Sequence, residues 1–514
     1  MDVGTLVARA ANRFRDRVAV ECEGEARTFA QLGDRVTRLA RGLLALGLMP
    51  GDRVLDLQGN SITCVESDLA IRSAGLVRVA LNHRLHPSDW ERITADSGAR
   101  AIVVAGEHAV GAAALIESLE HVVAVGGGAG LPYESIIAGQ IAGVLPAREP
   151  DTGCGLHYSS GTTGQPKGAR RTHRNWFASV TNMTHDVLGG VPSRDDVYVH
   201  AGPITHTSGL FLLPFLVAGA HQVVLPRWDP DAFVEAITER GGTHTAVVPT
   251  MIARLLGHAG ATRDSLAGLR MLAYAGAPMP SEQMRQAYEQ LTPNLVQYYG
   301  LVEAIPPVTV LTADDHARGV TGEPDLLGSA GRAALGVEIG VVDEDGRPVP
   351  TGEMGEVITR GDHVMAGYWN ATGRADLAKS VREGWLHTGD LGRLGGDGHL
   401  WLVDRKGDMI ISGGYNIYPR EVEDIMAEVP GVHEVAVLGL PDTDWGQRVV
   451  AFYTTTGGGP VDEQVIMDHC RSRLASYKKP KELRRIDAFP LSSTGKIAKK
   501  TLRSSLSDSG PNDQ

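Results

Sequence analysis

The chain contains the stretch Gly155-Leu156-His157-Tyr158-Ser159-Ser160-Gly161-Thr162-Thr163-Gly164-Gln165-Pro166-Lys167-Gly168. Its apolar start is typical of the end of a strand, and the rest is rich in glycine and hydroxyl side chains. Glycines let a backbone fold closely around a ligand, and successive N–H groups of such a loop can form an anion nest. With Lys167 adding a positive charge, the composition indicates a polyphosphate site, although flexible surface loops have a similar composition. The loop is not a Walker A motif, because it does not end in Gly-Lys-Ser/Thr.

The length and composition are those of a folded protein with more than one domain. The 514 residues exceed one ordinary hydrophobic core. A hydrophobic content of 42% and a charged content of 21% are typical of globular proteins. The net charge of −12 argues against a general nucleic-acid binder.

Nothing in the sequence predicts export or a membrane span. The first residues lack the basic and apolar regions of a signal peptide, and apolar runs such as 210–220 are too short to span a bilayer. Cys22, Cys64, Cys154 and Cys470 are widely scattered, which argues against a disulfide framework or a thiolate metal site. We therefore expect a cytoplasmic protein without a membrane span.

Short apolar strands alternate with helical patterns in the first part of the chain. This alternation implies buried, largely parallel sheets in an α/β architecture. A capping box at Thr28–Gln31 opens the first expected helix. The expected strands are 54–57, 77–81, 101–104, 122–125, 197–200, 222–225, 245–248, 271–274 and 295–299, and the expected helices are 64–74, 209–218, 231–240, 250–256 and 281–291.

The pattern changes near Gly328. Short segments at 337–342, 355–359 and 399–403 are separated by Gly, Asp and Pro, which indicates a small antiparallel or barrel-like sheet. After Asp404, helices at 420–426 and 461–474 and strands at 435–438, 449–453 and 483–489 indicate a compact α+β unit. We expect an N-terminal domain at 1–404 with a small β subdomain at about 328–403, a hinge at 405–408, a C-terminal domain at 409–505 and a disordered tail at 506–514.

Two further stretches carry groups suited to a nucleotide. Gln297-Tyr298-Tyr299-Gly300-Leu301-Val302-Glu303-Ala304 follows a strand, where α/β sheets collect ligands. A tyrosine there can stack on a purine and Glu303 can bind Mg²⁺, directly or through water; a buried aromatic cluster with a solvated glutamate is the alternative. Trp385-Leu386-His387-Thr388-Gly389-Asp390-Leu391-Gly392 contains Asp390, which can accept hydrogen bonds from ribose hydroxyls or simply occupy a turn.

Two more stretches lie near the end of the chain. Asp404–Pro419 has charges and glycines around a short apolar strand, a composition typical of a domain boundary. Pro490-Leu491-Ser492-Ser493-Thr494-Gly495-Lys496-Ile497 places Lys496 in a loop, where a lysine is usually solvated.

In their order along the chain, these five stretches resemble the motifs of the adenylate-forming (ANL) superfamily, and in particular its acyl-CoA synthetase, or AMP-dependent synthetase and ligase, family. The resemblance extends from about Thr28 to Lys500. It implies an AMP-forming acid–CoA ligase that makes an acyl-adenylate from a carboxylic acid and MgATP and then an acyl-CoA thioester, with ATP, Mg²⁺ and coenzyme A as cofactors. The implied α/β fold has a large N-terminal domain of two sheet layers with a small β-barrel-like part, and a small mobile α+β C-terminal domain.

The resemblance also implies roles for individual residues. Lys496 would bridge the substrate carboxylate and the α-phosphate, Glu303 would hold Mg²⁺ directly or through water, and His206 would be catalytic or a neighbour of the acid. The implied ATP/AMP site comprises Ser159, Ser160, Gly161, Thr162, Thr163, Gly164, Lys167, Ala277, Pro278, Tyr298, Tyr299, Gly300, Val302, Asp390 and Arg405. The implied acid pocket comprises His206, Thr207, Gly209, Ala275, Gly276 and Leu301. The implied CoA site comprises Gly413, Gly414, Arg84, Tyr477, Lys479 and Lys481, with Gly407 as the hinge. The alternative for His206 is a structural position in the core. The alternative for Arg84, Tyr477, Lys479 and Lys481 is a solvated surface position without a ligand.

The sequence departs from the family pattern at Val302, where threonine is usual, at Gly407, where Asp or Lys is usual, and at Tyr415, where glutamate is common. Loss of one hydroxyl contact costs about 1–3 kcal/mol, or about ten- to hundredfold in rate. One alternative is therefore an enzyme specialised for thioesterification of an adenylate made by a partner enzyme. Another is an adenylation enzyme that loads a carrier protein, and a third is a nucleotide-binding sensor without turnover. The sequence identifies neither the acid nor the oligomeric state.

Overall fold

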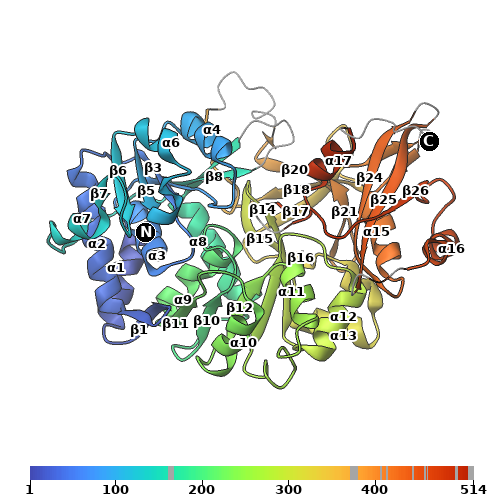
Figure 1. Ribbon diagram of the computed structural model, residues 1–514, viewed down its shortest axis with the longest axis horizontal. Coiled ribbons are helices and arrows are strands. Elements are labelled where there is room, and N and C mark those ends of the chain that lie inside the picture. Colours follow the sequence, from blue (N-terminus) through green and yellow to red (C-terminus); the bar gives the residue numbers. More distant parts are fainter. Residues whose placement is uncertain are drawn as a thin grey trace.

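The computed structural model describes residues 1–159, 167–370, 380–405, 408–412, 415–442, 445–456, 459, 461–492 and 496–507. Figure 1 shows two α/β layers in the N-terminal part, with the C-terminal part (orange to red) beside the strands that precede it. None of the described helices is long and apolar enough to cross a membrane.

The larger sheet consists, within the described residues, of nine strands in the order β16-β15-β14-β13-β12-β10-β11-β1-β2. Its central strands are parallel, whereas β2 at one edge and β15 and β16 at the other pair antiparallel. Strands β12 and β13 are buried along their whole length, as expected for strands covered on both faces. The bounds are β1 Val18–Cys22, β2 Glu25–Thr28, β10 Val197–His200, β11 His221–Val224, β12 His244–Val247, β13 Met271–Ala275, β14 Leu295–Leu301, β15 Ala304–Leu311 and β16 Arg332–Ala333.

The second sheet has seven strands among the described residues, in the order β7-β6-β5-β3-β4-β8-β9. All neighbours are parallel except β8 and β9, which form an antiparallel hairpin. Residues 160–166, which join these two strands, lie outside the described residues. The bounds are β3 Arg53–Leu57, β4 Val77–Ala80, β5 Ala101–Ala105, β6 His121–Val125, β7 Leu131–Pro132, β8 Gly153–Ser159 and β9 Lys167–Thr172.

Helices between the two sheets share one hydrophobic core with both of them. Phe29 and Leu39 of α2, Val54 of β3 and Tyr198 of β10 belong to the same buried cluster. The predicted capping box is present, with the Thr28 side chain accepting from the Gln31 N–H and the Gln31 side chain accepting from the Thr28 N–H. The helices up to β10 are α1 Val3–Arg13, α2 Phe29–Ala45, α3 Ile62–Ser73, α4 Pro87–Ser97, α5 Gly106–Ala109, α6 Ala113–Glu117, α7 Tyr133–Ala138, α8 His173–Asn182 and the π-helix η1 Met183–Val187.

A second cluster covers the other face of the larger sheet. Phe233 of α10 and Ile252 of α11 pack there with Tyr274 of β13. The remaining N-terminal helices are the 3₁₀ turn η2 Thr207–Phe211, α9 Leu212–Ala218, α10 Pro230–Thr238, α11 Pro249–Leu256, α12 Ser281–Gln290, α13 Ala313–Thr321 and the 3₁₀ turn η3 Pro324–Gly328.

The small sheet and the C-terminal part follow. The small sheet is antiparallel throughout, in the order β17-β18-β20-β19 with β21 on β20. In the C-terminal part a hairpin, β22-β23, precedes the sheet β24-β25-β26. The bounds are β17 Glu338–Val342, β18 Gly355–Arg360, β19 Val381–Arg382, β20 Trp385–Leu394, β21 Leu400–Arg405, β22 Ile410–Ser412, β23 Tyr415–Ile417, α15 Pro419–Ala427, β24 Val432–Asp442, β25 Gly446–Thr455, α16 Glu463–Arg473, β26 Glu482–Arg485 and α17 Lys499–Ser507.

The expected strands and helices are present with shifted ends, and the expected α/β architecture is confirmed. Elements that were not expected from the sequence include α1, β1, β2, α4, α8, β9, β15, α13, β20 and α17. Helix α17 continues to Ser507, two residues into the segment expected as the tail. This helix is anchored by Leu502, which is buried against the outer face of the C-terminal sheet. Residues 508–514 lie outside the described residues.

Candidate active site

Three of the predicted segments meet at one edge of the larger sheet. The parallel strands β10, β13 and β14 end at His200, Ala275 and Leu301, so the segments that follow them lie on the same side of the sheet. Ligands bind at this carboxyl edge in α/β proteins. The segment with His206, the Ala275–Gly276 corner and the 299–303 segment therefore form one candidate site.

Lys496 extends from the C-terminal part to this edge. A Cβ placed on Gly276 would lie 3.4 Å from Cε and 3.9 Å from Nζ of Lys496. Backbone contacts fix the lysine, because the Ser492 N–H donates to the Lys496 carbonyl and the Lys496 N–H donates to Ser492 Oγ, at 2.6 and 3.1 Å. The ammonium group thus lies against the wall predicted for the acid pocket.

His206 lies within electrostatic reach of this positive charge and is itself neutral at pH 7. Burial, followed by the positive charges of Lys496 and Arg171, lowers the pKa of His206 to about 4. Its Nδ1 lies 2.9 Å from Thr205 Oγ1. A neutral imidazole adds no second positive charge near the lysine.

Asp390 is fixed by Tyr299. The Tyr299 hydroxyl donates to Asp390 Oδ2 at 2.5 Å, which links β14 of the larger sheet to β20 of the small sheet. Asp390 is buried and lies opposite Arg405 in the β20–β21 ladder. The carboxylate predicted to bind ribose is therefore held at a defined position by an aromatic residue of the neighbouring motif.

Glu303 is connected to the β8–β9 hairpin through Tyr368. The Tyr368 hydroxyl donates to Glu303 Oε1 at 2.7 Å, and the Trp369 N–H donates to the Gly168 carbonyl at 2.7 Å. No group of three or more His, Cys, Asp or Glu side chains suited to a metal occurs among the described residues. A single carboxylate fits Mg²⁺, which is often held by one or two carboxylates together with water and phosphate oxygens.

Several predicted site residues have positions that packing explains. Tyr298 is only 1% exposed and its ring centroid lies 6.1 Å from that of Phe211 in the core, whereas its neighbour Tyr299 reaches Asp390. A Cβ on Gly209 would lie 1.9 Å from the Ile204 carbonyl oxygen, so η2 requires glycine at this position. A Cβ on Gly300 would contact Pro306 at 2.7 Å.

The other predicted residues of the acid and nucleotide sites line the same edge to different degrees. Ala275 is buried, Thr207, Leu301, Val302 and Ala277 are partly buried, and Gly276 and Pro278 are exposed. Lys167 opens β9 opposite Ser159 in the hairpin ladder. Ser160, Gly161, Thr162, Thr163, Gly164, Gly407, Gly413 and Gly414, and the side chains of Ser159 and Arg405, lie outside the described part of the structure.

The predicted CoA-site residues lie in two parts of the chain. Arg84 is exposed just after β4, and Lys479 and Lys481 belong to the C-terminal part. There Tyr477 stacks on Tyr415, with ring centroids 4.4 Å apart, and the ammonium of Lys481 lies 4.8 Å from the centroid of the Trp445 ring. The C-terminal part therefore presents aromatic surface and positive charge close together.

Two residues of the site were missed by the sequence analysis, Arg171 and Tyr368. Arg170 and Arg171 are consecutive in β9, so alternation of side chains along a strand requires one of them to point inward. That pattern was a usable signal for Arg171. The contact between Tyr368 and Glu303 joins residues far apart in sequence and had no local signal.

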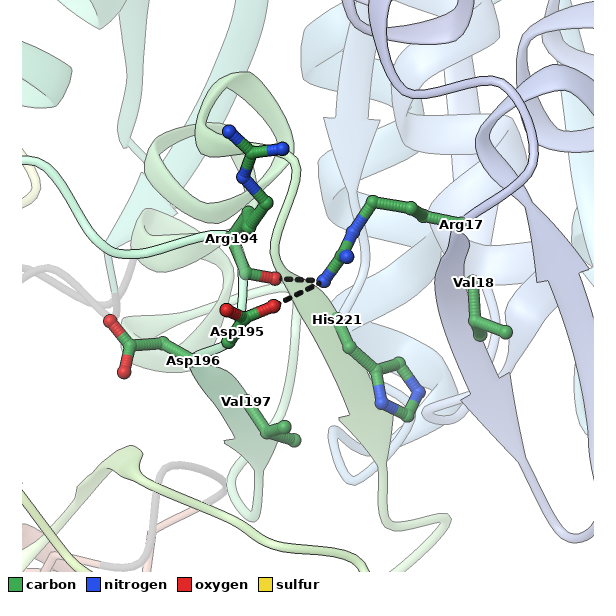
Figure 2. A pocket seen from close by; sticks show the side chains of 7 residues that line it. All are labelled: Arg17, Val18, Arg194, Asp195, Asp196, Val197 and His221. Atoms are coloured by element: carbon green, nitrogen blue, oxygen red, sulfur yellow. Dashed lines mark hydrogen bonds and ion pairs between the residues drawn. The ribbon is translucent and has the colours of Figure 1, made fainter.

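A surface cavity of about 360 Å³ lies away from this edge. Figure 2 shows its lining, which includes Val18, Val197 and His221 at the starts of β1, β10 and β11. Arg17 donates there to the Arg194 carbonyl and pairs with Asp195 at 3.1 Å. This cavity lies at the amino ends of the parallel strands, and it is not a candidate for the active site.

The chain matches two family models. Residues 7–369 match the AMP-binding enzyme model and residues 421–496 match the C-terminal domain of AMP-binding enzymes. The chain belongs to the AMP-binding enzyme family and is an AMP-forming acid–CoA ligase family enzyme of the ANL superfamily. The recognised family and the predicted class of enzyme are thereby confirmed.

Individual relatives match over nearly the whole chain. A feruloyl-CoA synthase of Amycolatopsis sp is 36% identical over 98% of both chains, and an indoleacetate–CoA ligase of Aromatoleum aromaticum is 32% identical over 98% of both. Among solved structures, ATP-bound MatB from Rhodopseudomonas palustris is 29% identical over 99% of both chains, with a TM-score of 0.88. The apo structure of MatB gives a TM-score of 0.79, so the present arrangement is closer to the ATP-bound structure.

Proposed function

We propose that the protein is an acyl-CoA synthetase that joins a carboxylic acid to coenzyme A in two steps, with MgATP consumed in the first. The observation that carries this proposal is the approach of Lys496 to Gly276, beside His206. In this arrangement Lys496, which is far from the other proposed catalytic residues in sequence, lies beside Gly276 of the proposed acid pocket. The better agreement with an ATP-bound relative than with its apo form supports an arrangement competent for adenylation.

In the first step a carboxylate oxygen attacks the α-phosphorus of ATP and pyrophosphate leaves. Lys496 stabilises the negative charge that the carboxylate and the α-phosphate share in the transition state. Asp390 accepts hydrogen bonds from the ribose. Glu303 would hold Mg²⁺ together with phosphate oxygens, and the ion would neutralise charge on the leaving group. No protein nucleophile is needed, so catalysis rests on positioning and electrostatics.

In the second step the thiolate of coenzyme A attacks the carbonyl carbon of the acyl-adenylate, and AMP leaves with the bonding electrons of the acyl–oxygen bond. We assign the CoA nucleotide to the surface around Tyr477, Lys479 and Lys481, with Arg84 contributing from the N-terminal part. Positive charge suits its phosphates, and an aromatic ring can stack on its adenine. Gly407 is the proposed hinge, and Gly413 and Gly414 are proposed to line the path of the pantetheine arm.

For the acid, we propose an aromatic carboxylate. Two of the most similar relatives are named for ferulate and indoleacetate. Ala275 and Gly276 occupy the proposed pocket wall, and their small side chains leave room for a ring.

A screen for AMP release tests this function. Hydroxycinnamic, benzoic and indolic acids are compared with medium- and long-chain fatty acids, each with and without coenzyme A. We expect CoA-dependent AMP release with an aromatic acid and a matching acyl-CoA by mass spectrometry. AMP release with fatty acids alone would overturn the substrate class, and release with no acid of either set would overturn the proposed function.

Val302 supports a second candidate, an enzyme that mainly performs the thioester step. Its side chain has no hydroxyl where the family usually has one. Exchange of labelled pyrophosphate into ATP, measured beside CoA transfer from a supplied acyl-adenylate, separates the candidates. Efficient acid-dependent exchange with ordinary Mg²⁺ dependence contradicts the second candidate.

A further inference from the structure

Arg171 is a buried arginine of β9 that contacts the Val302 carbonyl. Its side chain is on the inward face of β9 and the residue is 5% exposed, whereas the adjacent Arg170 is exposed. Nη2 donates to the Val302 carbonyl at 2.9 Å, and Nε is buried without a hydrogen-bond partner in the described structure. Among the described residues, no carboxylate lies within ion-pair distance of Arg171.

The neighbouring buried arginines are paired. Arg72 contacts Asp68 at 2.8 Å, and Arg78 contacts Asp56 at 2.6 Å and Asp68 at 2.7 Å. Arg72 also lies 4.0 Å from the centroid of the Trp176 ring, with Arg171 at 5.9 Å from the same ring. The carboxylates of Asp56 and Asp68 therefore pair with Arg72 and Arg78. Within the part of the chain that the structure describes, neither of them pairs with Arg171.

A buried cation without a counterion is costly unless another charge compensates it. Burial, followed by repulsion from Arg72, lowers the pKa of Arg171 to about 9, and Glu303 is the carboxylate that opposes this shift. The hydrogen bond to the Val302 carbonyl places the guanidinium one residue from Glu303, the proposed Mg²⁺ ligand. Arg171 therefore does not belong to the buried ion pairs of Arg72 and Arg78, and it is not a solvated surface residue either.

Arg171 also restrains the backbone next to Glu303. Val302 and Glu303 form the turn between β14 and β15, where Leu301 pairs with Ala304. Arg171 holds the Val302 carbonyl, the Met365 N–H holds the Glu303 carbonyl at 2.8 Å, and Tyr368 holds the Glu303 side chain. These three contacts fix both residues of the turn.

We propose that Arg171 is a positioning residue for adenylation. It holds the Val302–Glu303 turn in place, and with it the carboxylate proposed to bind Mg²⁺, at a position where Val302 provides no hydroxyl. This inference rests on the proposed function, because it assumes that Glu303 and a bound MgATP act at this edge of the sheet. The charge and the hydrogen bond come from β9, directly after the glycine-rich loop.

The experiment compares Arg171→Leu and Arg171→Lys with Arg170→Leu, a matched control on the exposed face of the same strand. Three quantities are measured: pyrophosphate exchange as a function of Mg²⁺, CoA transfer from a supplied acyl-adenylate, and calorimetric affinity for ATP with and without Mg²⁺. Loss of a hydrogen bond to a charged group predicts about a tenfold or larger fall in exchange for Arg171→Leu.

We expect Arg171→Leu to need several-fold more Mg²⁺ for half-maximal exchange, while CoA transfer stays within about twofold of the wild type. Arg171→Lys keeps the charge and should fall in between, and Val302→Thr added to Arg171→Leu should recover part of the exchange. Arg170→Leu should match the wild type in all three measurements.

Unchanged exchange and Mg²⁺ dependence in Arg171→Leu would overturn the inference. So would an equal loss of both half-reactions at unchanged Mg²⁺ dependence, because that pattern indicates a structural role alone. If Arg171→Leu does not fold, an unaltered Mg²⁺ dependence in Arg171→Lys counts against the inference.

Binding separates this inference from the proposed function. If the wild type shows no exchange with any acid, the proposed function fails. The calorimetric affinity for ATP with and without Mg²⁺ then still tests the role proposed for Arg171. The inference predicts that Mg²⁺ improves ATP affinity less in Arg171→Leu than in the wild type. An equal improvement in both proteins would contradict it.

Discussion

The hydroxyl of Tyr299 donates a hydrogen bond to Oδ2 of Asp390, with 2.5 Å between the two oxygens. Tyr299 is on the larger sheet and Asp390 is on the small sheet, so the bond joins the two sheets at the proposed nucleotide site. Because Asp390 is buried, its carboxylate depends on such donors for its orientation. The two motifs that were predicted separately for adenine and ribose are therefore joined by a direct hydrogen bond.

Tyr299→Phe keeps the ring and removes this donor. Since a hydrogen bond to a charged group is worth about 1.5–3 kcal/mol, we expect the KM for ATP to rise about tenfold or more. CoA transfer from a supplied adenylate also uses the ribose contact and should show a raised KM for the adenylate. An unchanged KM for ATP, measured at saturating acid, would show that Tyr299 does not orient Asp390 for the nucleotide.

Val302→Thr restores the hydroxyl that the family usually has at this position. We expect pyrophosphate exchange to rise about fivefold, as gaining one hydrogen bond of about 1 kcal/mol predicts. Val302→Ala is the control, because it changes the side chain without adding a hydroxyl and should not increase exchange. No gain in Val302→Thr would mean that Arg171 and the surrounding donors already fulfil the role of the hydroxyl.

Buried histidines predict a loss of stability on mild acidification. Burial lowers the pKa of each from 6.5 to about 4, so between these values the unfolded chain binds protons that the folded chain does not. Stability is therefore complete above pH 6.5 and falls as the pH drops toward 4, by up to about 1.4 kcal/mol per pH unit for each histidine. The histidines concerned are His173, His200, His206, His244, His316 and His363.

Urea unfolding at pH 7, 6 and 5 measures this effect. His200 offers a single-site test, because its two ring nitrogens lie 2.9 Å from Ser208 Oγ and 3.0 Å from Gln222 Oε1 in the core. His200→Gln cannot titrate, so the slope of unfolding free energy against pH should become shallower. A free energy of unfolding that stays constant from pH 7 to 5 in the wild type would contradict the prediction.

The sequence predicted elements and motifs well where the signal is local. The Thr28–Gln31 capping box and the buried strands β12 and β13 follow from neighbouring residues alone. The capping box of Thr172 and Asn175 at the start of α8 is equally local, but it uses asparagine in place of the usual Glu or Gln and was missed.

The sequence could not rank residues whose roles depend on distant contacts. Tyr298 and Tyr299 are the same residue type at adjacent positions, so the sequence does not distinguish their roles. Because side chains alternate along the strand, Tyr298 points into the core, whereas Tyr299 points toward β20 and contacts Asp390. Gly209 was assigned to the acid pocket from its motif. The structure gives another reason for a glycine here, because any side chain would collide with the Ile204 carbonyl oxygen. The position of Lys496 beside Gly276 needs the arrangement of the C-terminal part, which no local pattern contains.

Lys496→Ala tests the central claim most directly, with Lys500→Ala as a control at an exposed position nearby. Removing one preorganised donor from the transition state should lower acyl-adenylate formation by about a hundredfold or more. CoA transfer from a supplied acyl-adenylate should remain within about threefold of the wild type. We expect this separation of the two half-reactions in Lys496→Ala and wild-type rates in Lys500→Ala. Equal loss of both half-reactions, or adenylation that survives without the lysine, would contradict it.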